Sequence, residues 1–368
     1  MTPSLSEVSS FAAEKIRGTL EERYEAGLFS REIWRQMGSL GLLGMTVPGQ
    51  YGGAGGSALE LAGALREFTR AGCDMGTTVS WITHLALCVK SIEVLGTEQQ
   101  KEQYLPRLVS GEWVGATAVS EPKTGAHPAG ILTTATRTAS GFTLSGSKMY
   151  VTDGPVADLL VVVAMTDEDE SGHKELTSFL VETAAPGFEA KRMDMNFLAT
   201  SPHGELTFDG IELGPDSVLG SPGDGHSSFS RSAFARERSL VVAAFCGLFD
   251  AAAKAAADLL IAREGAFDLK GQEAYTWVHH MSALEAYRRL SETLVDDALT
   301  DIERWRGSID LLIYLGISYA RWASWIERFA SERKLGSSAL LNIMLADMKL
   351  VMVGEGLLLK QGIKRYIT

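Results

Sequence analysis

The spacing of apolar residues divides the chain into three parts, of which the first is helical. Over residues 1–113 apolar side chains recur at intervals of three and four, as at Leu40, Leu43 and Val47, which is the period of an amphipathic helix. The Gly- and Pro-rich segment 48–56 interrupts this pattern, and we interpret it as a turn. These features predict an N-terminal helical domain.

The second part, residues 114–225, consists of short runs of alternating or β-branched residues separated by Gly, Asp and Pro. Such runs are typical of strands. The clearest of them lie at 132–137, 142–145, 159–164, 178–182 and 205–208. Because no helical pattern lies between them, they indicate a central antiparallel β-sandwich or barrel domain and not a parallel nucleotide-binding sheet.

The third part, residues 226–368, again shows only helical periodicity. We expect helices over 240–262, from 275 to about 304, from 309 to about 333, and from about 339 onwards. The order of helices, sheet and helices predicts an α+β multidomain protein with boundaries near residues 113 and 225.

Charge and composition narrow the class of ligand. The 368 residues include 34 Lys and Arg against 46 Asp and Glu, a formal net charge of −12. Nucleic acids and anionic lipids are bound through clustered Lys and Arg, so a small molecule is the expected ligand. The longest apolar run, 240–249, is much shorter than the roughly 20 residues of a membrane span. The first residues lack the apolar region of a signal peptide, so neither a span nor export is expected.

The positions of cysteine and histidine predict neither a disulfide nor a metal site. Cys73, Cys88 and Cys246 lie far apart without a CxxC pair. His279 and His280 are adjacent, so they lack the i, i+4 spacing of a helical metal site. Unpaired thiols fit a reducing compartment, and we expect a cytoplasmic protein.

Four motifs, taken in order, resemble the acyl-CoA dehydrogenase family of flavoenzymes. LGLLGMTVPGQYGGAG at 40–55 resembles the early "GLLG…VP…YGG.G" segment of the family, and LGTEQQKEQYLPRLVSGE at 95–112 resembles "GTEEQK..YLP.L..GE". VSEP at 119–122 stands where the family has "TEP", and KMYVTDG at 148–154 where it has "KMWITNG". The order and separation of these motifs give the resemblance its weight.

The resemblance implies a helical N-terminal domain, a central β-domain and a C-terminal four-helix bundle, assembled as a homodimer or homotetramer. It also implies that FAD binds between the β-domain and the helices. Hydroxyl groups are suited to hydrogen-bond the polar edge of the flavin ring, and an aromatic side chain is suited to pack on its face. The positions that match the family's flavin contacts are Val119, Ser120, Tyr150 and Thr152.

Two glutamates match positions at which members of the family carry a catalytic base. Glu355 lies where most members have theirs, and Glu237 corresponds to the alternative position on the first bundle helix used by isovaleryl-CoA and carrier-protein-linked prolyl dehydrogenases. A carboxylate in a dry pocket has a raised pKa and can remove the α-proton of an acyl thioester. The structural alternative for each glutamate is a solvated ion pair on a helix.

Some positions around the expected dinucleotide site differ from the family pattern. Ala126 stands where a serine usually donates to the pyrophosphate, and Asp268 replaces a glycine. Ser201 matches a polar position on the thioester side and is a predicted substrate contact. The remaining predicted cofactor contacts, some of which reach a neighbouring subunit in the family, are Arg263, Phe267, Gln272 and Gly336.

The resemblance implies an oxidoreductase that acts on CH–CH bonds. The reaction would be FAD-dependent α,β-dehydrogenation of an acyl-CoA or acyl-carrier-protein thioester, with a glutamate base and hydride transfer to flavin N5. An electron-transfer flavoprotein or oxygen would accept the electrons. The changed dinucleotide motifs leave two alternatives, namely a subunit of a heteromeric acyl-CoA dehydrogenase, and a non-catalytic binding protein of the same fold with weakened flavin binding.

Overall fold

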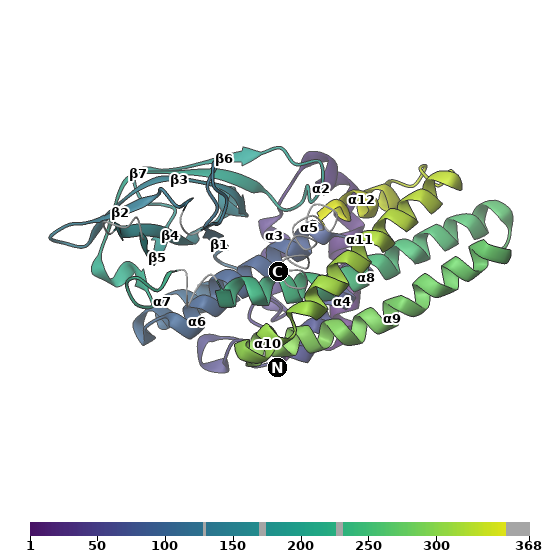
Figure 1. Cartoon of the computed structure of the whole chain (residues 1–368), viewed down its shortest axis with the longest axis horizontal. Coiled ribbons are helices and arrows are strands. Elements are labelled where there is room, and N and C mark those ends of the chain that lie inside the picture. Colours follow the sequence, from purple (N-terminus) through teal and green to yellow (C-terminus); the bar gives the residue numbers. More distant parts are fainter. Residues whose placement is uncertain (128–129, 169–173, 226–230, 351–368) are drawn as a thin grey trace, which may run out of the picture.

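The computed structural model describes residues 1–127, 130–168, 174–225 and 231–350. Their helices and strands follow the predicted order, with a helical region, a sheet and a second helical region. In Figure 1 the sheet lies at one end of the molecule with α6 and α7 below it, and the long helices α8, α9 and α11 extend toward the other end. The predicted fold class is therefore confirmed. The candidate base Glu355 lies outside the described residues.

Capping boxes start three of the N-terminal helices, at Ser4, Ser57 and Thr97, where the cap side chain and the third helical residue satisfy each other's backbone N–H groups. The predicted turn at 48–56 is present and contains a short 3₁₀ helix. The elements of this region are α1 (Leu5–Phe11), η1 (Ala12–Ile16), η2 (Arg17–Thr19), α2 (Leu20–Ala26), α3 (Arg31–Ser39), η3 (Gly49–Tyr51), α4 (Ala58–Gly72), α5 (Met75–Thr83), η4 (His84–Val89), α6 (Lys90–Leu95) and α7 (Glu98–Val109).

The β region forms one eight-stranded sheet in the order β6-β7-β3-β2-β4-β5-β8, with β1 paired to β4. Most pairs are antiparallel as expected, but β1 and β2 each pair with β4 in parallel. The elements are β1 (Gly115–Ala118), β2 (Thr134–Arg137), β3 (Phe142–Thr152), η6 (Gly154–Val156), β4 (Leu159–Glu168), β5 (Lys174–Glu182), β6 (Phe188–Met193), β7 (His203–Leu213), η7 (Pro215–Ser217) and β8 (Val218–Leu219).

The sheet curls around an apolar core of its own. Two strands, β2 and β4, lie between β3 and β5 in the sheet order, yet the rings of Phe142 on β3 and Phe179 on β5 meet edge to face with centroids 5.0 Å apart. Phe188 on β6 and Phe208 on β7 are register partners whose rings pack at a tilt with centroids 5.8 Å apart. This curvature carries the ends of β1 and β3 toward the helices.

The C-terminal region is built on α8 (Arg231–Glu264), α9 (Gly271–Thr300), α10 (Ile302–Gly307), α11 (Ile309–Glu332) and α12 (Ala339–Asp347). The helix that we expected to reach residue 304 stops earlier, because the Asp301 side chain caps a new helix by accepting from the N–H groups of Glu303 and Arg304. A stack of Phe249 on Trp322, with centroids 4.5 Å apart, joins α8 to α11.

Helix α8 packs directly against the N-terminal region. A side chain at Gly247 would overlap the backbone carbonyl of Arg66 on α4, so glycine is required for this close crossing. Arg66 also forms an ion pair with Glu292 on α9 at 2.9 Å. The two helical regions therefore share one continuous core.

Two helical stretches, Met75–Leu95 and Ser232–Glu264, are long and apolar enough to cross a membrane by length and composition. Their apolar windows are 78% and 72% buried inside the molecule. Packing in the protein core accounts for such a composition, so these helices are not evidence of a membrane span.

Candidate functional site

A cavity of about 140 Å³ lies where the sheet meets the helices. It joins four of the predicted cofactor contacts with one of the two candidate bases. The residues that line it are Thr83, Leu87, Thr117, Val119, Ser120, Met149, Tyr150, Val151, Thr152, Phe234 and Glu237. They come from α5, η4, the end of β1, the end of β3 and the first turns of α8.

A buried ion pair holds the segment that follows β1 in place. The Lys148 ammonium donates to the Val119 carbonyl at 3.0 Å and to Glu121 Oε1 at 2.9 Å. The Glu121 carboxylate also accepts from the backbone N–H groups of Leu132 and Thr133. Burial alone would raise the pKa of Glu121, but Lys148 and the backbone donors outweigh it and lower that pKa. Val119 and Ser120 are thus fixed against β3.

Tyr150 is in a left-handed backbone conformation, with φ of 60°. It lies at a bulge in β3, between Lys148 and Val151, where the register with β7 shifts. A non-glycine residue in this conformation costs about 1–2 kcal/mol, and strain of this kind is concentrated at functional sites. Tyr150 is 57% exposed and lines the cavity, so that a bound ring system can pack on its side chain.

Polar side chains behind the cavity form a connected network. Thr152 Oγ1 lies 3.2 Å from His203 Nε2, and His203 Nδ1 lies 2.9 Å from the Ser201 carbonyl oxygen. The Ser80 hydroxyl is 3.0 Å from Ser201 Oγ and donates to Asp153 Oδ1 at 2.7 Å. The predicted substrate contact Ser201 is therefore buried in this network and does not line the cavity.

Glu237 stands in the first turns of α8 with its side chain at the cavity. Burial raises its pKa, and the neighbouring Arg238 opposes this rise. The preceding residue, Arg236, is buried and donates to the Ala86 carbonyl at 3.2 Å and to Ser91 Oγ at 3.3 Å. Because Ala86 belongs to the π-helix η4, Arg236 fixes the start of α8 against another wall of the cavity.

The cavity offers a polar atom that lacks a partner. Among the described residues, the buried Thr117 hydroxyl oxygen makes no hydrogen bond. Buried polar groups normally pair, so a ligand that supplies a hydrogen bond here would satisfy it. The volume is below the roughly 300–1,000 Å³ of pockets for drug-sized ligands. A ligand of that size would therefore extend beyond this cavity.

The other predicted cofactor contacts lie elsewhere. Arg263 donates to the Arg333 carbonyl, Phe267 packs on Trp277 with centroids 4.7 Å apart, and the Gly336 carbonyl accepts from Asn342. Gln272 lines a separate hollow beside Trp325 and Phe329. Arg263 ends α8, Gln272 begins α9, and Phe267 and Gly336 lie in the turns that follow α8 and α11. Figure 1 places these turns at the end of the bundle remote from the sheet.

Motif reasoning found Val119, Ser120, Tyr150, Thr152 and Glu237 but missed other residues that line the cavity. Thr83, Leu87 and Phe234 carry no motif, and only the docking of α5, η4 and α8 on the sheet brings them together. Thr117 belongs to β1, whose small residues Gly, Ala, Thr and Ala gave no strand signal. His203 was visible only as a polar residue at the start of a strand.

This arrangement of domains is that of solved acyl-CoA dehydrogenases. Butyryl-CoA dehydrogenase from Megasphaera elsdenii matches with a TM-score of 0.83 and 25% identity, over 97% of this chain and 95% of that chain. The chain belongs to the acyl-CoA dehydrogenase family, because the sequence models of the N-terminal domain and the middle domain of that family match residues 4–112 and 116–211.

Two further proteins match this chain. The mitochondrial isovaleryl-CoA dehydrogenase of Solanum tuberosum is 38% identical over 221 residues, which are 59% of this chain and 53% of that protein. A prolyl acyl carrier protein oxidase shares the fold with a TM-score of 0.81 and 23% identity, over 94% of this chain and 92% of that chain. The chain spans about half the length of the curated relatives it matches.

Proposed function

We propose that this protein is an FAD-dependent acyl-thioester dehydrogenase, which forms a double bond between the α- and β-carbons of its substrate. The observation that carries the proposal is that Glu237 lines the same cavity as Ser120 and Thr152. A carboxylate base and the hydroxyls suited to a flavin ring thus face one space. Similarity to an isovaleryl-CoA dehydrogenase supports this choice of base.

Glu237 removes a proton from the α-carbon, and this proton passes to a carboxylate oxygen of Glu237. Burial raises the pKa of Glu237, and this makes the carboxylate a stronger base near neutral pH. FAD, when bound, supplies the acceptor for the hydride that leaves the β-carbon. Leu87 and Phe234 provide apolar walls that keep water from the reacting carbons.

Val119, Ser120, Tyr150 and Thr152 would hold the flavin ring, because all four line the cavity. The group of Arg263, Phe267, Gln272 and Gly336 is remote from that cavity. We therefore propose that it binds the cofactor of a neighbouring copy, and that the protein is a homodimer or homotetramer.

We propose an acyl-CoA as the substrate ahead of an acyl-carrier protein. The net charge of −12 disfavours the approach of an acidic carrier protein by like-charge repulsion. An electron-transfer flavoprotein or oxygen would take the electrons. Comparing the reaction rates of CoA and carrier-protein thioesters of the same acyl group tests the proposed substrate. Comparing the rates with an electron-transfer flavoprotein and with oxygen identifies the electron acceptor.

The base is tested with Glu237→Gln and Glu355→Gln as a matched pair. Both purified proteins should bind FAD as the wild type does, which a visible absorbance spectrum measures. Glu237→Gln should slow bleaching of the flavin by acyl-CoA about 10²- to 10⁴-fold, the usual worth of a general base. Glu355→Gln should reduce the rate far less. A slow Glu355→Gln beside a normal Glu237→Gln would assign the base to Glu355. A wild type without flavin would contradict the proposed function itself.

A further inference from the structure

The ring of His203 lies directly behind Thr152, which lines the cavity. His203 begins β7 and is 9% exposed. Its Nδ1 atom is 2.9 Å from the Ser201 carbonyl oxygen, and its Nε2 atom is 3.2 Å from Thr152 Oγ1. Both ring nitrogens are therefore within hydrogen-bond distance of a partner.

The chemistry of these two partners fixes the tautomer. A carbonyl oxygen can only accept, so the proton of the neutral ring must be on Nδ1. Nε2 then has a lone pair and no hydrogen, and can only accept. The Thr152 hydroxyl must donate to it.

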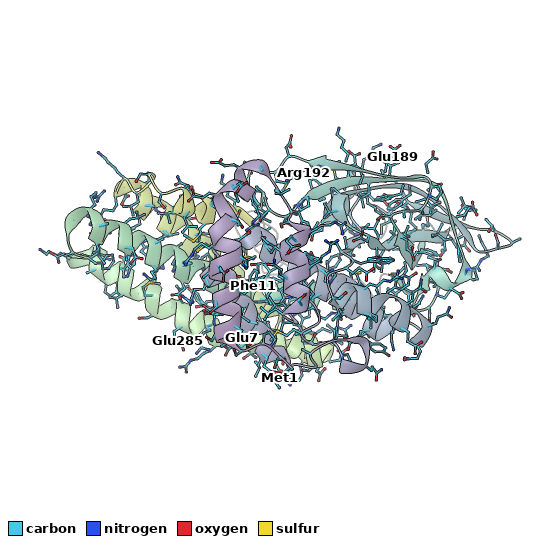
Figure 2. All side chains as sticks on the ribbon, turned by 180° about the vertical axis from the view of Figure 1, so that it is seen from behind. Met1, Glu7, Phe11, Glu189, Arg192 and Glu285 are labelled. Atoms are coloured by element: carbon cyan, nitrogen blue, oxygen red, sulfur yellow. The ribbon has the colours of Figure 1, made fainter. Side chains whose placement is uncertain are left out.

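His203 is surrounded so that the neutral ring is favoured. Burial lowers its pKa, and the positive charge of Arg192 lowers it further. Arg192 is on the neighbouring strand β6, one residue before the partner of His203 in the strand register. Figure 2 shows it where the sheet approaches the N-terminal helices, and its guanidinium donates to the carbonyls of Gly27 and Ala199. Those bonds keep its charge in place.

We propose that His203 is a positioning residue that commits the hydroxyl hydrogen of Thr152 to Nε2, so that Thr152 presents only an acceptor to the cofactor in the cavity. This inference rests on the proposed function, because it requires a flavin in that cavity. An unconstrained threonine hydroxyl would rotate and act as donor or acceptor.

The direction of this hydrogen bond affects the two redox states of a flavin differently. Oxidised flavin has a lone pair at N5, whereas reduced flavin has an N–H there, and the N3–H donor is the same in both states. An acceptor hydroxyl at Thr152 that faces N5 pairs with the reduced ring and not with the oxidised one. His203 should therefore favour the reduced form and raise the reduction potential of the bound flavin.

The tautomer can be measured in the wild-type protein without cofactor. The ¹⁵N chemical shifts of the His203 ring should show a hydrogen on Nδ1 and none on Nε2 near neutral pH. This is the opposite of the usual preference of a free histidine. A hydrogen on Nε2 would overturn the proposal, whether or not the protein binds flavin.

The effect on the cofactor is tested with three variants and the reduction potential of bound FAD. His203→Leu removes the acceptor, so the ratio of affinities for reduced and oxidised FAD should fall about tenfold, which is about 30 mV for a two-electron couple. His203→Gln places an amide oxygen near the position of Nε2 and should restore most of that ratio. In a Thr152→Val background, His203→Leu should produce no further change.

The outcomes separate this inference from the proposed function. A His203→Leu shift that persists in Thr152→Val would show that His203 acts by packing alone, and an unchanged potential in His203→Leu would also contradict the inference. In either case flavin binding, and with it the proposed function, would stand. If the wild type binds no FAD, the proposed function fails first. If His203→Leu does not fold, the tautomer measurement on the wild type still tests the proposed role of His203.

Discussion

Asp153 has a carboxyl that is buried beside the cavity network. Burial raises its pKa to about 7, while hydrogen bonds from the hydroxyls of Ser80 and Ser201 oppose the rise. In the unfolded chain the group titrates near its usual value of 3.8. Between these two values the unfolded state loses the proton and the folded state keeps it. The contribution of Asp153 to stability is therefore complete below about pH 4 and is lost as the pH rises through 7.

Replacement of this carboxyl by an amide should remove that loss. We expect Asp153→Asn to be more stable than the wild type at pH 7.5 by on the order of 1–4 kcal/mol, at about 1.4 kcal/mol per unit of pKa shift. The difference should shrink toward pH 4. Urea unfolding at pH 4, 5.5 and 7.5 measures it. Asp347 is a second buried carboxyl with a pKa of about 7, but it is present in both proteins and cancels in the comparison.

The exposed Asp209→Asn is the matched control and should not change the pH dependence. A difference between Asp153→Asn and the wild type that is the same at all three pH values would show that Asp153 does not titrate as proposed.

At the scale of elements, the end of β1 depends on β3 through the Lys148–Glu121 pair. Both side chains are almost fully buried. Removal of one partner of a buried pair leaves an unpaired charge, whereas replacement of both by apolar residues is often tolerated. Loss of one partner should therefore reduce the stability of the fold more than replacement of both partners.

Lys148→Met should lower the free energy of unfolding by about 3–5 kcal/mol and, because Val119 loses its donor, should weaken FAD binding. The double variant Lys148→Met with Glu121→Leu should recover a large part of the stability. Urea unfolding and FAD titration of both variants measure the two effects. A double variant less stable than Lys148→Met would contradict this account.

The sequence predicted a strand or helix correctly where the pattern that defines it lies within one short segment. Alternation identified the strand at 142–145, and a continuous β-branched run identified that at 159–164; they are parts of β3 and β4. The edge strand β6 was missed because charged residues cover its exposed surface. The break at Asp301 was missed because helical periodicity continues through it, and only the capping geometry reveals the new helix.

The same limit applies to the site. Ser120 and Thr152 were predicted by motif, since each belongs to a short segment with a recognisable order of residues. Their common cavity with Glu237 depends on the docking of α8 against the sheet, which no local pattern encodes. The hydrogen-bond direction at Thr152 depends on His203, 51 residues further along the chain.

At the scale of the whole molecule, the predicted cofactor contacts fall into two separate groups, one at the junction of the sheet and the helices and the other at the far end of the bundle. Gln272 lies in the remote group and is exposed. If it binds the cofactor of a neighbouring copy, Gln272→Ala should weaken FAD binding by roughly 2- to 12-fold, from the 0.5–1.5 kcal/mol of one hydrogen bond. Fluorescence titration of the apoprotein with FAD measures this change.

Lys254→Ala is the control, because Lys254 is exposed on α8 and pairs only within that helix, with Asp258. It should bind FAD as the wild type does. Light scattering of both variants should give the oligomeric mass of the wild type. Unchanged FAD affinity in Gln272→Ala would exclude this residue as a contact across subunits.

The walls of the cavity belong to elements that can vary independently. The hydroxyls suited to the cofactor belong to the sheet, whereas Glu237 stands on α8 and is fixed by Arg236 to η4. A substitution of the proposed base Glu237 in the first turns of α8 therefore leaves the strands in place. In evolution, the chemistry can therefore change or be lost through substitutions in this one turn of α8, while the strand residues proposed to bind the cofactor stay unchanged. Duplicated genes can diverge in the same way.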